Sequence, residues 1–342
     1  MDTLEKFLAS NPEDVLPVDR EDMDDIQACA QYVKEIYAYL LFSENKYRLP
    51  ENFLANQSSY DDTERALLID WTSRAHSKFA LANESFFHFV SILDTLAARV
   101  PMLQYDFKLI SIACLLIASK YEQSYIPSLR HYVEIITQEP QIRYVNCDSC
   151  LYAAQHIHNL QEVRAHAVFD GQEPCSPETL QNLQKLGPCP ACARAAIMQA
   201  EETILHILEF DLAAPTPLTF LRRYAKIANM KARDRYIAFY LGELCMLNSN
   251  MVRQFKASQI AAGCVAMARR LTRKPSWGEE LEGYSGYGEA DVKAILSEVS
   301  VTLKSLALSP KAKYIRKKYS QQDRFYGVSL LIENVVGQVV GQ

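Results

Sequence analysis

Residues 106–122 read DFKLISIACLLIASKYE, a run that is apolar almost all the way round a helix. A helix of this kind belongs at the centre of a helical domain, because it presents no polar face to water. Residues 255–271, FKASQIAAGCVAMARRL, repeat this character further along the chain. The two runs predict two buried central helices, each the core of its own helical unit.

Amphipathic helices flank both central helices in a similar order, and repeated order implies repeated packing. Gly contributes only 11 of 342 residues, and helical spacing prevails over alternation. We therefore predict an all-α protein made of two tandem five-helix folds. The flanking helices are expected at 61–79, 84–99, 127–137 and 193–209, then at 217–230, 233–248 and 288–307, with a short ambiguous piece near 277–284.

The ends of the chain and one insert complete the predicted organisation. An amphipathic helix is expected at 24–42, and the tail from 310 onward, basic and then mildly apolar, is expected to be extended. The predicted domains are 1–55 (leader and N-terminal helix), 56–212 (first fold, containing an insert at 141–192), 213–310 (second fold) and 311–342 (tail).

Composition narrows the class of protein. Hydrophobic residues make up 49% and charged residues 23%, the balance of a soluble globular protein. No apolar run reaches the roughly 20 residues that span a bilayer, so no membrane role is expected. The net charge of -5 gives no general attraction to phosphate backbones, so no nucleic acid partner is expected. We expect the chain to act in the nucleus and cytoplasm.

Several stretches resemble one known family. Residues 64–71 (ERALLIDW) resemble the opening helix of the cyclin box, and residues 115–122 (LLIASKYE) resemble its third-helix signature. Mitotic A/B-type cyclins are also similar, in sequence and in order, to four later stretches: 209–216 (EFDLAAPT), 217–223 (PLTFLRR), 251–263 (MVRQFKASQIAAG) and 313–320 (KYIRKKYS).

The resemblance implies a non-catalytic subunit that binds and activates a cyclin-dependent Ser/Thr kinase and so controls cell-cycle progression, at G2/M. In that family the kinase is bound by a Lys that ends the third helix and by a Glu on the fifth. These positions correspond here to Lys120 and Glu201. A one-residue slip in the match would put the adjacent Glu202 in the place of Glu201. The full kinase-binding set that the resemblance implies is Lys120, Glu201, Tyr32, Ile36, Tyr39, Ile117, Glu122 and Phe210.

Each of these positions also has a purely structural interpretation. A Lys at a helix C-terminus suits the helix dipole, whatever its partner. Ile117 and Phe210 could be core residues. The stripe that begins at Tyr32, with its i, i+4, i+7 spacing, could pack on the protein's own core instead of on a kinase.

The family's substrate-docking patch is altered. Its apolar part is kept as Leu67, Leu68 and Trp71. The Met position is occupied by Glu64, the acidic position by Arg74 and the Gln position by Lys108. Because Arg74 would repel the basic residue of an Arg-x-Leu docking peptide, we expect such peptides to bind poorly.

The insert carries two cysteine pairs with metal-ligand spacing. Cys147 and Cys150 form one pair, and Cys189 and Cys192 form the other. Two thiolate pairs suit tetrahedral zinc, so we predict that a structural zinc closes the insert, while the fold itself requires no cofactor. His156 or His158 could replace a thiolate. The alternative is a partly disordered insert that binds no metal.

No catalytic motif accompanies these features: there is no glycine-rich phosphate loop, no serine nucleophile elbow and no His-Glu-x-x-His. We therefore expect a non-enzyme whose partners are the kinase and its protein substrates. Two alternatives remain, a cyclin-fold transcription factor of the general B type and a kinase-free scaffold. The first would carry its zinc module ahead of basic repeats, whereas here the cysteines lie within the first repeat.

Overall fold

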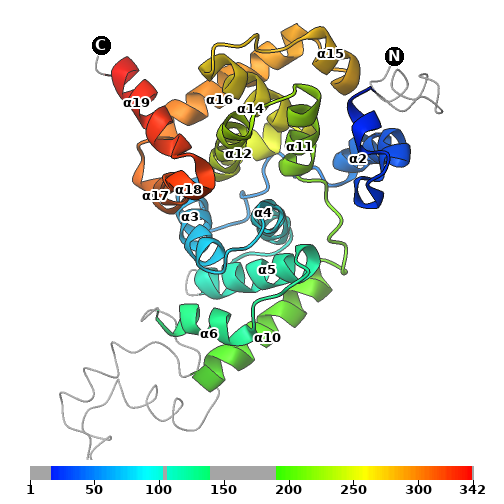
Figure 1. Ribbon diagram of the computed structural model, residues 1–342. Helices are drawn as coiled ribbons and strands as arrows, with labels where there is room; N and C mark the ends of the chain where they lie inside the picture. Colours follow the sequence, from blue (N-terminus) through cyan, green and yellow to red (C-terminus); the bar gives the residue numbers. More distant parts are fainter. Residues whose placement is uncertain (1–16, 103–105, 139–189, 341–342) are drawn as a thin grey trace, which may run out of the picture. The chain divides into compact units, whose positions relative to one another are not determined.

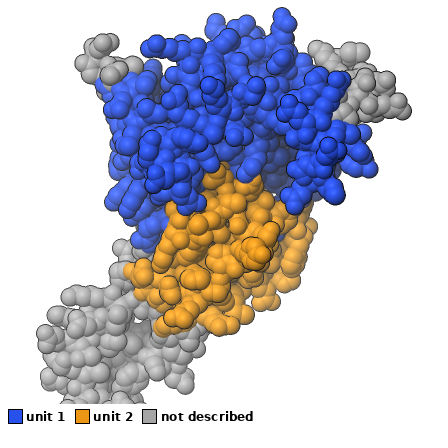
Figure 2. Space-filling model, viewed as in Figure 1, with its two compact units in different colours: residues 1–56, 61–74, 212–342 blue, residues 57–60, 75–211 orange. Residues whose placement is uncertain are grey.

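The structure, a computed structural model, describes residues 17–102, 106–138 and 190–340 (Figure 1). Throughout these ranges the ordered elements are helices, as predicted. Within them no helix combines the length and apolar character that a membrane span requires. The chain divides into two compact units (Figure 2), which are described separately: residues 57–60 and 75–211 form one, and residues 1–56, 61–74 and 212–342 form the other.

The first repeat surrounds α5, the predicted central helix. Its helices are α3 (Asp62–Lys78, shared with the other unit), α4 (Asn83–Arg99), α5 (Phe107–Glu122), α6 (Leu129–Thr137) and α10 (Pro190–Ile207). Helices α4, α6 and α10 all pack on α5, whose residues from Ser111 to Ser119 are buried without a break. A helix buried all round is what its apolar sequence predicts.

The C-terminal repeat is built in the same way around α14. Its helices are α11 (Pro217–Ile227), α12 (Ala232–Leu247), α13 (Ser249–Gln254), α14 (Ala257–Leu271), α15 (Glu279–Ser285) and α16 (Glu289–Leu306). Helices α11, α12 and α16 pack on α14. Gly263 lets α16 approach closely, because a Cβ there would lie 2.6 Å from the Ile295 side chain. The prediction of two tandem helical folds is confirmed.

The N-terminal helix is shorter at its start than predicted. Instead of a helix from residue 24, there are three 3₁₀ turns, η1 (Pro17–Asp22), η2 (Ile26–Ala28) and η3 (Ala30–Tyr32), before α2 (Val33–Lys46). The Asp25 side chain accepts a hydrogen bond from the Gln27 amide, and Cys29 is left-handed with φ of 48°. Such a local side-chain bond competes with helix formation, which delays the start of α2.

The tail is helical, so the expectation of an extended segment is wrong. It forms η5 (Pro310–Ala312), α17 (Lys313–Tyr319), α18 (Gln322–Phe325) and α19 (Val328–Val340). Val328, Ile332 and Val336 recur every four residues and are all buried, which is the spacing of one helix face. In α17 the buried residues Ile315 and Tyr319 are also four residues apart, but the charged residues around them hide this spacing in the sequence.

A buried carboxylate holds the start of α17. The Asp70 side chain, on α3, accepts hydrogen bonds from the backbone amides of Tyr314 and Ile315 at 2.9 to 3.0 Å. These donors are free at a helix N-terminus, and the helix dipole favours a negative charge there. Burial nevertheless outweighs the backbone donors and raises the pKa of Asp70 to about 6.

This raised pKa predicts a pH-dependent contribution to stability. Since the folded chain holds the Asp70 proton more tightly than the unfolded chain, the contribution is complete below about pH 4 and is lost as the pH rises through about 6. Relative to Asp70→Asn, the native chain should gain about 1 kcal/mol of unfolding free energy between pH 8 and pH 5. Denaturant titrations of both proteins measure this, and a difference that does not change with pH would contradict it.

Candidate functional site

The predicted activation pair is brought together by α5 and α10. Lys120 Nζ, in the last turn of α5, donates a hydrogen bond to Glu201 Oε1 at 2.6 Å. The Lys120 side chain is 48% exposed and that of Glu201 15%, so the pair lies at the surface with its ammonium accessible. Glu202, the alternative, is exposed. The structure thus places Glu201 beside Lys120.

Glu122, two residues beyond Lys120, is held from the side of α4. Its Oε1 lies 2.8 Å from Nδ1 of His88, whose side chain is buried. The Tyr121 ring packs edge-on against the His88 ring, with centroids 4.5 Å apart, and the tyrosine remains 53% exposed. The end of α5 is therefore fixed, and this fixes the position from which Lys120 projects.

The two apolar members of the predicted set differ in exposure. Ile117 is 3% exposed and belongs to the core of α5, as its structural interpretation held. Phe210 is 62% exposed. Glu209 and Phe210 are both left-handed, with φ of 55° and 57°, which is uncommon outside glycine and turns the chain sharply at the end of α10. This turn directs the Phe210 ring outward.

Exposed apolar side chains in the same unit were missed from the sequence. They are Tyr121, Tyr125, Ile126 and Met198. Tyr125 and Ile126 lie between α5 and α6, where no helical period identifies an exposed face. Exposed aromatic residues and Met are enriched in protein interfaces, so their exposure in the unit of the Lys120 pair favours a binding surface.

The N-terminal stripe of Tyr32, Ile36 and Tyr39 is exposed on one face of η3 and α2. The opposite face carries Tyr37 and Leu41, which are buried. Within its own unit the helix therefore packs through its other face and leaves the stripe uncovered. Ile26 and Phe42 in the same N-terminal region are exposed as well, and the prediction did not include them.

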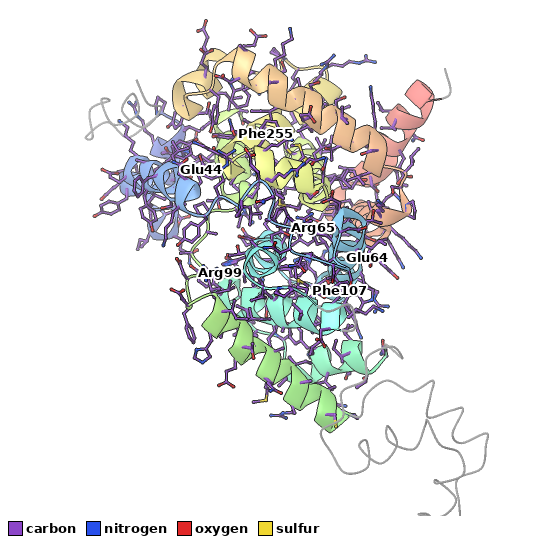
Figure 3. The ribbon with its side chains drawn as sticks, turned by 180° about the vertical axis from the view of Figure 1, so that it is seen from behind. Glu44, Glu64, Arg65, Arg99, Phe107 and Phe255 are labelled. Atoms are coloured by element: carbon purple, nitrogen blue, oxygen red, sulfur yellow. The ribbon has the colours of Figure 1, made fainter. Side chains whose placement is uncertain are left out.

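The predicted docking patch lies on α3, apart from Lys108, which starts α5 in the other unit. Leu67 is exposed and Leu68 is buried. Glu64 and the buried Arg65 occupy the first turns (Figure 3). The Arg74 guanidinium lies over the Trp71 ring, 5.5 Å from its centroid, and 5.8 Å from the centroid of Tyr314. Arg74 thus covers the aromatic ring of the patch and places a positive charge on it.

This arrangement predicts altered peptide docking. Arg74→Glu should strengthen binding of a basic Arg-x-Leu peptide by on the order of 10-fold, because it replaces repulsion by attraction and uncovers Trp71. Fluorescence anisotropy of a labelled peptide measures the affinity. Lys78→Glu, which makes the same charge change one turn further along α3, is the matched control. Tight binding of the peptide to the unmodified protein would disprove the prediction.

The predicted zinc site lies almost entirely outside the described residues. Cys147, Cys150 and Cys189 are not described, and Cys192 is buried in the first turn of α10. Among the residues that are described, no group of three or more His, Cys, Asp or Glu side chains could hold a metal ion. The zinc site therefore stays a prediction.

Two tandem helical repeats with an N-terminal helix packed on the second define a protein of the cyclin-fold class. Residues 35–213 match the family model of the cyclin N-terminal domain, and residues 215–334 match that of the cyclin C-terminal domain. The chain belongs to the cyclin family.

Relatives and a solved structure agree with this assignment. The chain is 30% identical to G2/mitotic-specific cyclin-B of Dictyostelium discoideum over 304 residues, which cover 88% of this chain. It is 28% identical to G2/mitotic-specific cyclin-B2 of Oryzias latipes over 310 residues, which cover 90% of this chain. It spans 57% and 65% of the length of these relatives. A viral cyclin from herpesvirus saimiri shares the fold, with a TM-score of 0.52 and 17% identity over 78% of this chain and 97% of the viral one.

Proposed function

We propose that this protein is a non-catalytic regulatory subunit that binds and activates a cyclin-dependent Ser/Thr kinase and controls progression through G2/M. Membership of the cyclin family and similarity to G2/mitotic-specific cyclins support the proposal. We further propose that it acts in the nucleus and cytoplasm, presents protein substrates to the kinase, and requires no cofactor.

The observation that carries the proposal is the surface pair of Lys120 and Glu201. The resemblance to the cyclin box indicated these two residues, which lie 81 residues apart in the sequence, and the folded chain joins them by a 2.6 Å hydrogen bond. A half-exposed ammonium at a helix end can donate to backbone carbonyls of a partner, and a carboxylate beside it can accept from backbone amides. An exposed Phe210 in the same unit adds apolar area.

The mechanism that fits is a shift of population. A subunit that contributes no reacting group can activate a kinase only by binding its active arrangement more tightly than its inactive one. A change from mostly inactive to mostly active, 1:99 to 99:1, requires a preference of about 10⁴-fold. Such a preference can be shared between two surfaces. One is the stripe of Tyr32, Ile36 and Tyr39, and the other is the surface around Lys120.

Reconstitution tests the proposal. The purified chain is titrated onto the catalytic subunit of a mitotic cyclin-dependent kinase, and phosphorylation of a histone substrate is measured. We expect activity to rise and saturate with the amount of complex formed. Binding without activation would favour a kinase-free scaffold, and retention of promoter DNA instead of kinase would favour a transcription factor.

A further inference from the structure

The segment that leads into α2 has almost no hydrophobic core of its own. Residues 17–32 form three short 3₁₀ turns, and of these residues only Asp19 and Ala30 are buried. Met23, Ile26 and Tyr32 are exposed, Ile26 at 92%. Since ordering a residue costs about 1–2 kcal/mol of backbone entropy, a segment with so little apolar burial needs another attachment to stay folded.

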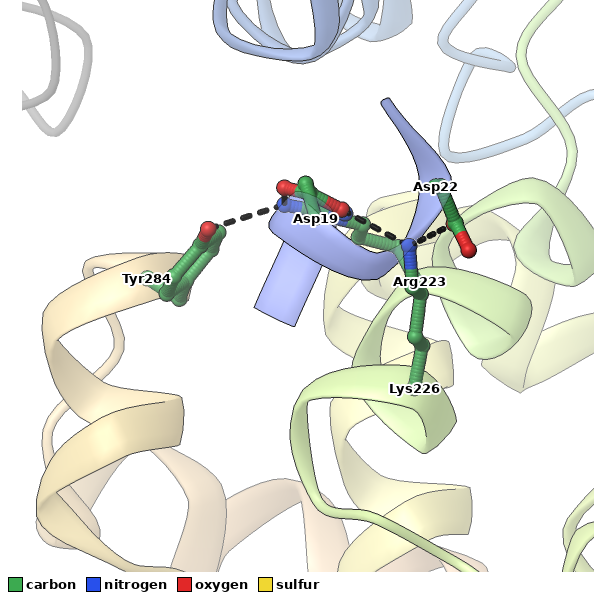
Figure 4. Close-up of polar contacts among 5 residues, drawn as sticks. All are labelled: Asp19, Asp22, Arg223, Lys226 and Tyr284. Atoms are coloured by element: carbon green, nitrogen blue, oxygen red, sulfur yellow. Dashed lines mark hydrogen bonds and ion pairs between the residues drawn. The ribbon is translucent and has the colours of Figure 1, made fainter. Parts of the chain in front are cut away.

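That attachment is a cluster of charges on the C-terminal repeat (Figure 4). Both oxygens of Asp19 accept hydrogen bonds from the Arg223 guanidinium, at 2.6 and 2.7 Å. Lys226, one turn further along α11, donates to Asp19 at 2.8 Å and also pairs with Asp22. Arg223 in turn donates to the Tyr284 hydroxyl of α15 at 2.9 Å. We call Asp19, Asp22, Arg223, Lys226 and Tyr284 the charge clamp.

The Asp19–Arg223 pair at the centre of the charge clamp is desolvated and is therefore specific in geometry. The Asp19 side chain is 1% exposed and that of Arg223 12%. Burial opposes ionisation of Asp19, but the hydrogen bonds from Arg223 and Lys226 outweigh burial and lower its pKa, so Asp19 is charged at neutral pH. Removing one partner of such a pair is strongly destabilising because it leaves the other charge buried and unpaired, and the bidentate Arg–carboxylate geometry also fixes orientation.

Helix α2, which follows this segment in the chain, is attached to the C-terminal repeat by two polar contacts. The Tyr37 hydroxyl lies 2.6 Å from the Tyr224 hydroxyl, on α11. The buried Glu44 carboxylate (labelled in Figure 3) accepts hydrogen bonds from the amide and hydroxyl of Ser258, at the N-terminus of α14. Residues 23–32 are therefore bracketed by the charge clamp upstream and by α2 downstream. Ile26 and Tyr32 both lie in the bracketed part.

We propose that Asp19 is a positioning residue: through Arg223 and Lys226 it holds residues 23–32 folded on the C-terminal repeat before any partner arrives, so that Ile26 joins Tyr32, Ile36 and Tyr39 in one preformed binding stripe. The first part of this inference concerns the free chain, and the second rests on the proposed function. A preformed stripe strengthens binding because the entropy of ordering the segment is lost during folding and not during association.

Hydrogen exchange of the free full-length chain tests the first part. Asp19→Asn removes the negative charge of the pair with little change of shape, and Arg223→Gln removes its positive charge. Both should speed exchange of the amides of residues 19–32, with no change in α12 or α14. Asp24→Asn, the same substitution at an exposed position of the segment, is the control and should behave as the native chain. Unchanged exchange in both clamp variants would overturn the proposal.

Kinase affinity tests the second part. Asp19→Asn should weaken binding to the catalytic subunit of a cyclin-dependent kinase by about 10-fold, while the activity of the saturated complex stays native, because the stripe still binds once it is ordered. The Asp19→Asn/Arg223→Gln double variant should bind no worse than either single variant. Native affinity in a variant with accelerated exchange would overturn the positioning role. Failure of the native chain to bind a kinase would refute the proposed function alone, because the exchange experiment needs no kinase.

Discussion

Replacing Lys120 by alanine should weaken kinase binding, and activation at limiting concentration, by about 10- to 100-fold, because a hydrogen bond to a charged group contributes roughly 1.5–3 kcal/mol. Glu201→Ala should have a similar effect, since it removes an acceptor and releases the Lys120 ammonium, which Glu201 holds at 2.6 Å. Titration of kinase activity against each variant separates affinity from maximal activity.

The controls follow from the structure. Glu202→Ala removes an exposed carboxylate next to Glu201, and Lys293→Ala removes an exposed lysine from α16 in the other unit. Both should activate as the native chain does. Surface ion pairs contribute about 0–1 kcal/mol to stability, so the thermal unfolding midpoints of all variants should lie close together. Full activation by the Lys120→Ala/Glu201→Ala double variant, with unchanged affinity, would show that this surface does not bind the kinase.

The central helices were predictable from the sequence because their burial is nearly uniform. Every residue of α5 from Ser111 to Ser119 is buried, so no detail of orientation was needed to place it. The activation pair required more than periodicity. Lys120 and Glu201 lie on different helices, and only the resemblance to the cyclin box linked them. The structure then showed that they are neighbours, which spacing within one helix could not have shown.

The segments that were wrongly predicted are those in which polar contacts determine the backbone. At 24–32 the apolar spacing indicated a helix, but the Asp25 cap and the left-handed Cys29 interrupt it. Asp19 gave no signal, because its partners Arg223 and Lys226 lie more than two hundred residues away. Long-range ion pairs leave no period in a sequence, so the charge clamp could be found only in the folded chain.

The tail was predicted wrongly for a related reason. Lys318 looks like one more charge in a solvated basic run, yet it is buried against α12. Its ammonium donates to Glu243 Oε1 at 2.5 Å, and the Tyr319 hydroxyl donates to the same oxygen at 2.8 Å. Glu243 is fully buried. A lysine that reads as a surface residue thus provides the countercharge for a carboxylate in the core.

Lys318→Met should therefore destabilise the chain by about 3–5 kcal/mol, because it leaves the Glu243 charge buried with only a neutral hydroxyl as donor. Denaturant-induced unfolding measures the loss. Lys317→Met, the same change at the exposed neighbouring position, is the control and should lie within about 0.5 kcal/mol of the native chain.

The Glu243→Gln/Lys318→Met double variant decides whether the loss comes from the unpaired charge or from packing. If the unpaired Glu243 carboxylate causes the loss, removing its charge should restore most of the stability, since replacing a whole buried ion pair by uncharged groups is often neutral. If instead the lysine's own contacts are the main contribution, through its ammonium over the Tyr319 and Phe325 rings and through its apolar stem, the double variant should be no more stable than Lys318→Met. We expect recovery, because the methionine keeps most of the apolar stem while the glutamine keeps an oxygen for the Tyr319 hydroxyl. A double variant that remains as unstable as Lys318→Met would refute the charge explanation.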